Sequence, residues 1–266
     1  MDPIVPNAFE SPDVLNLLFH PRPGLPVQEE EETTFDLFYA AGDGERLAMR
    51  FHLKEREAPT LLFFHGNGEV ASDYEDIAGH YLASGFNFVI GEFRGYGLSH
   101  GTPGVSHLLD DARTGFLFLE AWLKSNGWTG PLAVMGRSLG SAPALEVAHA
   151  FPQRVGALII ESGFARFKEL LFTLGLPRHM SLPKETHGPN NLGKMTHWRG
   201  PLLIIHATDD EIIPFSEGED LFQASASEEK HFLKIEEAGH NDLFYIGFQA
   251  YLNALANMAQ QLKQTR

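Results

Sequence analysis

Cysteine is absent from this sequence of 266 residues. That absence excludes disulfide bonds, thiolate metal sites and a cysteine nucleophile, and it suits a reducing compartment. Basic residues are scarce, because 20 lysines and arginines stand against 35 aspartates and glutamates, for a formal net charge of -15. Such a charge repels phosphate backbones and anionic membrane surfaces, so nucleic acid is not an expected partner.

Long apolar runs are also missing. No stretch approaches the roughly eighteen consecutive apolar residues of a membrane span, and the amino-terminal residues have no basic region followed by an apolar one. No H-E-x-x-H or similar spacing occurs, so we expect no metal and no cofactor. Together these features predict a soluble, cytoplasmic protein without a membrane span.

The composition is that of a folded globular chain. Hydrophobic residues make up 43% of the sequence and charged residues 21%, and we expect residues 1–266 to form a single domain. Residues 1–33 contain several prolines and the acidic run at 29–32. We therefore expect an amino-terminal surface arm with a short helix near residues 11–19 and a solvated acidic face.

The order of apolar segments predicts an α/β fold. Residues 34–40 and 46–53 flank a Gly-Asp-Gly turn and predict an antiparallel hairpin. After residue 60, short strands that are apolar on both faces alternate with helical segments, which is the pattern of a parallel sheet with helices on both faces. The expected strands are 61–64, 87–90, 132–135, 157–160, 202–205 and 231–235, and the expected helices are 72–83, 106–124, 139–150, 215–225 and 242–263.

The alternation fails between residues 162 and 200. This segment carries Pro177, Pro183 and Pro189 and a polar stretch at 187–194. Long irregular insertions in compact domains tend to be lids or binding loops. We expect a small cap over the carboxyl edge of the sheet.

Two segments match G-x-S-x-G, the turn that presents a serine nucleophile between a strand and a helix. The first, at residues 97–101, runs into Thr102 and Pro103, so we interpret Ser99 as a loop serine. The second, at 136–140, follows an apolar strand and opens a helix with Pro143 in its first turn, where a missing N–H is tolerated. The sequence thus predicts Ser138 as the nucleophile.

A base and an acid are expected later in the chain, each beyond a strand end. His240 follows the last strand on a loop and is the best candidate base among thirteen histidines. Three adjacent carboxylates, Asp209, Asp210 and Glu211, follow the preceding strand, and only one of them can orient the imidazole. His65 and His206, at strand ends, are expected to be structural hydrogen-bonding residues.

The oxyanion of a tetrahedral intermediate needs backbone N–H donors. Leu139 follows the nucleophile at the positive end of its helix, and the His-Gly-Asn-Gly loop at 65–68 follows the first parallel strand. We expect Leu139 and Asn67 to supply these donors.

At these residues the chain resembles the α/β-hydrolase superfamily, and within it the α/β-hydrolase-domain group that includes acyl-protein depalmitoylases. The resemblance rests on the motifs at 65–68, 94–99, 136–140, 206–214 and 239–242. It implies that Asp210 is the acid, since the family pattern His-Gly-x-x-Asp-x-x-Val-Pro places it there. It also implies a serine hydrolase that cleaves a small-molecule carboxylic ester or thioester through an acyl-enzyme.

Other interpretations remain open. A serine peptidase or amidase of the same fold is the main alternative. A dinucleotide-binding protein would explain Gly-x-Gly-x-x-Ala at 66–71 and Glu92, but it leaves Ser138, Asp210 and His240 unexplained. A non-catalytic binding protein would need a broken triad.

Seven residues are candidates for lining the substrate site. Arg137 could attract an acidic group or be a plain surface charge. The others form an apolar stripe in the cap that could equally pack onto the domain, and they are Phe164, Phe167, Leu170, Leu171, Phe172 and Leu174.

Overall fold

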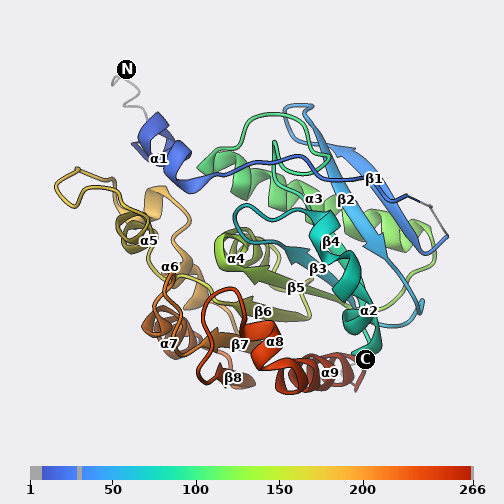
Figure 1. The fold of residues 1–266 in the computed structure, drawn as a ribbon. Helices are drawn as coiled ribbons and strands as arrows, with labels where there is room; N and C mark the ends of the chain where they lie inside the picture. Colours follow the sequence, from blue (N-terminus) through green and yellow to red (C-terminus); the bar gives the residue numbers. More distant parts are fainter. Residues whose placement is uncertain (1–7, 29–31, 265–266) are drawn as a thin grey trace.

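A computed structural model of the chain describes residues 8–28 and 32–264. Its centre is one eight-stranded sheet in the order β1-β2-β4-β3-β5-β6-β7-β8 (Figure 1). The strands are β1 (Thr34–Ala40), β2 (Arg46–His52), β3 (Thr60–Phe64), β4 (Asn87–Gly91), β5 (Leu132–Arg137), β6 (Ala157–Glu161), β7 (Leu202–Ala207) and β8 (Lys230–Ile235).

The sheet begins antiparallel and continues parallel. β1 and β2 form a hairpin, β2 also runs antiparallel to β4, and every later pairing from β4 to β8 is parallel. The fold class predicted from the sequence is confirmed. Because β3, β5, β6, β7 and β8 are parallel, the loops that follow them leave the sheet at the same edge.

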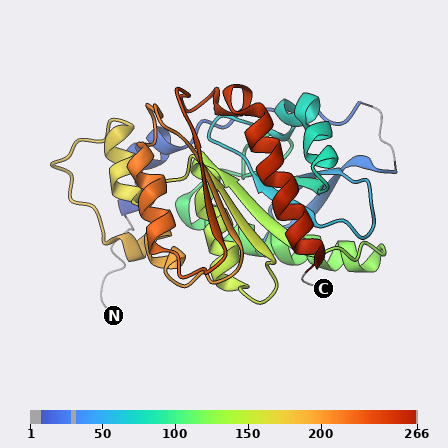
Figure 2. The same ribbon diagram turned by 90° about the horizontal axis from the view of Figure 1, so that it is seen from below.

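Helices cover both faces of this sheet, as Figure 2 shows from below. α3 (Val105–Ser125), α4 (Ser141–Ala150) and α7 (Phe215–Ala224) cover one face, and α2 (Glu75–Ala83) and α9 (Phe248–Gln264) cover the other. Residues of β5 alternate between the two cores: Leu132 and Val134 face the first, and Ala133 and Met135 the second. Burial on both faces explains why these strands are nearly all apolar.

The last predicted helix is divided in the structure. A short α8 (Leu243–Ile246) precedes α9, and Gly247 lies between them. A Cβ at Gly247 would lie 2.4 Å from Cδ1 of Ile235, so only a glycine lets the chain pass this close to the end of β8.

The amino-terminal segment packs onto the domain instead of forming a solvated arm. The expected helix is present as α1 (Pro12–Leu18), after the short η1 (Ala8–Glu10). Phe9, Val14, Leu18 and Phe19 are all buried in the larger core. In the acidic run, residues 29–31 lie outside the described part of the chain.

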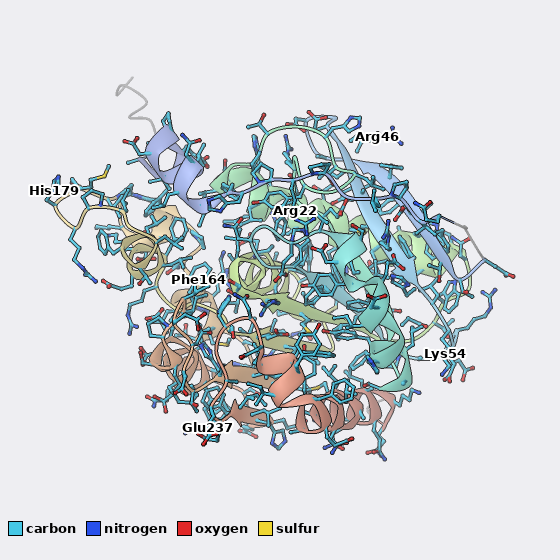
Figure 3. All side chains as sticks on the ribbon, in the orientation of Figure 1. Arg22, Arg46, Lys54, Phe164, His179 and Glu237 are labelled. Atoms are coloured by element: carbon cyan, nitrogen blue, oxygen red, sulfur yellow. The ribbon has the colours of Figure 1, made fainter. Side chains whose placement is uncertain are left out.

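The irregular segment between β6 and β7 contains α5 (Phe167–Thr173), η4 (Glu185–His187) and α6 (Asn191–Met195). α5 lies against α1, and Figure 3 shows His179 at the outer tip of the loop that follows α5. α6 packs on α4 and α7. The segment thus extends the body of the molecule beyond the carboxyl edge of the sheet.

Residues 8–28 and 32–264 contain neither a membrane-spanning helix nor a cluster of metal-ligating side chains. No helix there combines the length and the apolar character needed to cross a membrane. No group of three or more histidine, aspartate or glutamate side chains in this part of the chain could hold a metal ion.

Candidate active site

Ser138 lies on a sharp turn between β5 and α4. Its backbone is left-handed, with φ of 52°, a conformation that costs a non-glycine residue about 1–3 kcal/mol. A Cβ at Gly136 would lie 2.1 Å from the Gly140 carbonyl oxygen, and a Cβ at Gly140 would lie 2.1 Å from that of Phe64. Both flanking glycines are therefore required by backbone packing, and together they keep Ser138 at the tip of the turn.

His240 and Asp210 form a buried pair. Nδ1 of His240 is 2.8 Å from Oδ2 of Asp210 and 3.0 Å from Oδ1, and the Asp210 side chain is inaccessible to solvent. The backbone N–H groups of Ile212 and Ile213 also donate to Oδ1 of Asp210. A carboxylate that accepts from Nδ1–H leaves Nε2 of His240 free to accept a proton.

The three adjacent carboxylates have different surroundings. Asp209 and Glu211 are exposed, whereas Asp210 is buried. Burial raises the pKa of Asp210, but its hydrogen bond to His240 and the charge of that imidazole outweigh burial, so the pKa is lowered. Glu211 accepts from the backbone N–H of His240 at 3.1 Å, which holds the loop. Only Asp210 contacts the imidazole.

Ser138 and His240 line the same cavity, whose volume is about 190 Å³. In the described part of the chain, the Ser138 hydroxyl forms no hydrogen bond with His240, and the Ser138 carbonyl accepts from the hydroxyl and the backbone N–H of Ser141. Catalytic hydrogen bonds often tighten only when substrate is bound. The nucleophile and the base therefore line one cavity without a hydrogen bond between them.

The predicted oxyanion residues lie at the same cavity. Asn67, Gly66 and Leu139 all line it. The Asn67 side chain is fixed because its Oδ1 accepts from the Tyr96 hydroxyl at 2.7 Å and from the backbone N–H of His20 at 3.0 Å. The loop after β3 thus has a defined position opposite the turn that carries Ser138.

Arg137 is buried and links several loops, so it is neither a surface charge nor, as the sequence also suggested, a residue that lines the cavity beside Ser138. Its guanidinium donates to Glu69 at 2.8 Å and Glu161 at 2.9 Å, and also to the His240 carbonyl and the Asn241 side chain, each at 3.1 Å. Burial opposes its charge, but Glu69 and Glu161 more than compensate, so the pKa of Arg137 is raised. Sequence reasoning missed this role, because nothing in a single sequence pairs Arg137 with residue 240.

The predicted apolar lining is partly wrong. Phe164, Phe167, Leu171 and Phe172 pack in or against the core and are not among the residues that line the cavity beside Ser138. Leu170 and Leu174 do line it, and Leu18 and Ile212 complete its aliphatic side.

Other candidates from the sequence have structural contacts. The Ser99 hydroxyl is buried, accepts from the Ala48 N–H at 2.9 Å and donates to the Glu92 carbonyl at 3.2 Å. His65 contacts the Gly66 carbonyl and His206 the Ile213 carbonyl. The Glu92 carboxylate accepts two backbone N–H groups and thereby stabilises a loop.

Comparison with protein families agrees with this geometry. A family model described as "Serine aminopeptidase, S33" matches residues 55–187, which is half of the chain and includes Ser138. The matched part does not reach Asp210 or His240.

Individual relatives point the same way. The human α/β-hydrolase domain-containing protein 17B is 29% identical over 226 residues, covering 82% of this chain and 72% of the relative. The lysophosphatidylserine lipase ABHD12 of Danio rerio is 30% identical over 185 residues, which are 63% of this chain and 47% of the lipase. An esterase from Pyrococcus furiosus, 16% identical, superimposes with a TM-score of 0.71 over 91% of this chain and 100% of the esterase. The chain therefore belongs to the α/β-hydrolases, in the family described as serine aminopeptidase S33.

Proposed function

We propose that the chain is a serine hydrolase that cleaves a carboxylic ester or thioester through an acyl-enzyme, with Ser138, His240 and Asp210 as its triad. One observation carries the proposal: the buried Asp210–His240 pair and the strained Ser138 turn meet at one cavity. A serine hydroxyl is weakly nucleophilic at neutral pH and needs a base oriented by a third group.

The reaction follows from this arrangement. Oγ of Ser138 attacks the substrate carbonyl carbon while Nε2 of His240 takes the hydroxyl proton. The N–H groups of Asn67 and Leu139 stabilise the oxyanion, and such a donor contributes about 10²–10³ in rate. His240 then protonates the departing alcohol or thiol, and the acyl-enzyme is hydrolysed by a water that His240 deprotonates. Asp210 stabilises the imidazolium in both steps.

An amidase or aminopeptidase is the second candidate, favoured by the description of the matching family model. An aminopeptidase needs a carboxylate free to bind the substrate ammonium group. Among the described residues that line the cavity, Glu69 is the carboxylate, and its Oε1 binds Arg137 while Oε2 binds the Gly66 N–H and the Tyr74 hydroxyl. An ester or thioester substrate therefore fits this cavity better than an amino-terminal peptide.

The test combines covalent labelling with turnover. We expect a fluorophosphonate to label the wild type and the Ser99→Ala variant, which keeps the second G-x-S-x-G intact, but not Ser138→Ala. The wild type should hydrolyse p-nitrophenyl acyl esters faster than aminoacyl anilides, and Ser138→Ala should lose at least about 10³-fold in kcat. Labelling that persists in Ser138→Ala would refute the assignment of the nucleophile. Turnover of anilides alone would replace the esterase by the amidase.

A further inference from the structure

The end of α1 reaches the catalytic cavity from a part of the chain that the family model does not match. Leu18 lines this cavity together with Ser138, whereas the match begins at residue 55. The segment is firmly held, because Phe9 packs edge-on against Phe167 of α5, with 5.0 Å between ring centroids. α1 and α5 lie side by side in both ribbon views (Figures 1 and 2).

The cavity has two chemically different sides. The polar part of its lining comes from Ser138 and His240 together with Gly66, Asn67, Glu69 and Asn241. The other side is aliphatic and comes from three separate segments: Leu18 of α1, Leu170 and Leu174 at α5, and Ile212 of the loop after Asp210. A group attached to the carbonyl carbon at Ser138 would therefore lie against side chains that contain no polar atoms.

We propose that residues 12–20 and α5 together form the binding site for a short aliphatic acyl chain, with Leu18 as a residue that limits its length. This inference rests on the proposed function, because it places the acyl part of the same substrate. The volume of about 190 Å³ lies below the roughly 300–1,000 Å³ of typical ligand pockets, so a short chain fills it. Each methylene buried there removes apolar surface from water and so favours binding of the acyl chain.

A second cavity, of about 240 Å³, lies behind this aliphatic wall. Leu170 and Ile212 line both cavities, so these two side chains form the partition between them. Truncation of Leu170 joins the two spaces and lengthens the site. A bulky residue at position 18 has the opposite effect, because it fills the cavity from the α1 side.

The test is the ratio of kcat/KM for p-nitrophenyl octanoate to that for the acetate. We expect Leu18→Trp to lower this ratio at least about tenfold and Leu170→Ala to raise it at least about tenfold, since one methylene in an apolar pocket changes selectivity by about 10–200-fold. The matched control is Leu17→Ala: Leu17 packs against the core without lining the cavity, so its ratio stays at the wild-type value. Partial unfolding lowers both rates equally and leaves the ratio unchanged.

The result that overturns the inference is an active wild type whose ratio is the same in Leu18→Trp and Leu170→Ala. A wild type that hydrolyses no ester contradicts the proposed function instead. In that case the rate constants for inactivation by ethyl and octyl fluorophosphonates measure the same preference, because phosphonylation of Ser138 requires no deacylation. Rates that are equal for both reagents in wild type and variants would also overturn the acyl-chain site.

Discussion

At the scale of single residues, the site depends on one buried arginine beside the nucleophile. Arg137 joins the end of β5 to Glu69, to Glu161 of β6 and to the carbonyl of His240. These contacts join the loop after β3, the end of β6 and the loop after β8 at the carboxyl edge of the sheet. A guanidinium suits this position because its five donors are fixed in one plane, whereas an ammonium group is a single point of charge.

We predict that Arg137→Lys folds but loses catalysis. The lysine keeps a charge for Glu69 and Glu161 but does not also hold the His240 carbonyl, so the imidazole shifts within the cavity that it shares with Ser138. Misplacement by about 1 Å costs about 10²-fold in kcat, while KM should stay within about threefold. The matched control is Arg154→Lys at an exposed pair with Glu120, which should leave kcat unchanged. Equal effects of Arg137→Lys on kcat and on the fraction of folded protein would contradict a positioning role.

The sequence alone showed which of the two G-x-S-x-G motifs lies between a strand and a helix. It did not show which side of α5 faces the cavity. The strand before Ser138 and the helix after it are evident from the sequence, and the structure has both. In α5, Phe167 and Leu171 form one stripe, and Leu170 and Leu174 form the neighbouring one. Periodicity shows that apolar stripes exist, but not which of two adjacent stripes faces the core and which faces a cavity.

At the scale of elements, the turn between β5 and α4 requires its two glycines. Alanine at Gly140 would place Cβ 2.1 Å from a backbone oxygen of Phe64, which is held in β3 and cannot move aside cheaply. We predict that Gly140→Ala lowers the free energy of unfolding by about 1–3 kcal/mol, as overpacking does, and displaces Ser138. Loss of fluorophosphonate labelling together with a lower urea midpoint would be the expected result.

The matched control for this prediction is Gly79→Ala in α2. Within the described residues, no other side chain or distant backbone lies within 4 Å of a Cβ at Gly79, and alanine is the better helix former. The free energy of unfolding should rise by about 0.5–1 kcal/mol without any effect on labelling. If Gly140→Ala behaves like Gly79→Ala, the steric argument for the turn is wrong.

The central strands were predictable because each is a short run that is apolar on both faces, and the long helices because amphipathic or glycine-bounded segments separate these runs. The amino-terminal segment was not, because its prolines and acidic run are typical of solvated arms, and its few apolar residues form no long pattern. Phe9, Val14 and Leu18 are buried by long-range packing, of η1 on α3 and of α1 on α5. The packing on α5 depends on the segment between β6 and β7, whose irregular sequence carries little information about its shape.

At the scale of the whole molecule, buried histidines couple stability to pH. Burial lowers the pKa of His52, His65 and His206 below the ordinary 6.5. The unfolded chain therefore binds protons more readily than the folded protein at these sites. Their contribution to stability is complete above pH 6.5 and is lost as the pH falls below it. Glu92 acts in the opposite direction, because burial raises its pKa from the ordinary 4.5, so its contribution is lost as the pH rises.

Between pH 4.5 and 6.5, a falling pH thus lowers the stability of the folded protein through three histidines and raises it through one glutamate. We predict that the histidines prevail and that Tm falls as the pH is lowered from 7.5 to 5.5. His52→Phe should make the decline shallower, because the phenylalanine can still stack on Phe88 but has no proton to bind. Glu92→Gln should make the decline steeper, because Glu92 is the one of these four groups whose protonation stabilises the folded protein. Calorimetry of the three proteins in buffers of equal ionic strength measures these slopes. Equal slopes for wild type and His52→Phe would show that the His52 imidazole does not contribute to the loss of stability in acid. Paired carboxylates such as Asp210 do not explain a loss in this range, because a pKa lowered from 3.8 affects stability only below about pH 4.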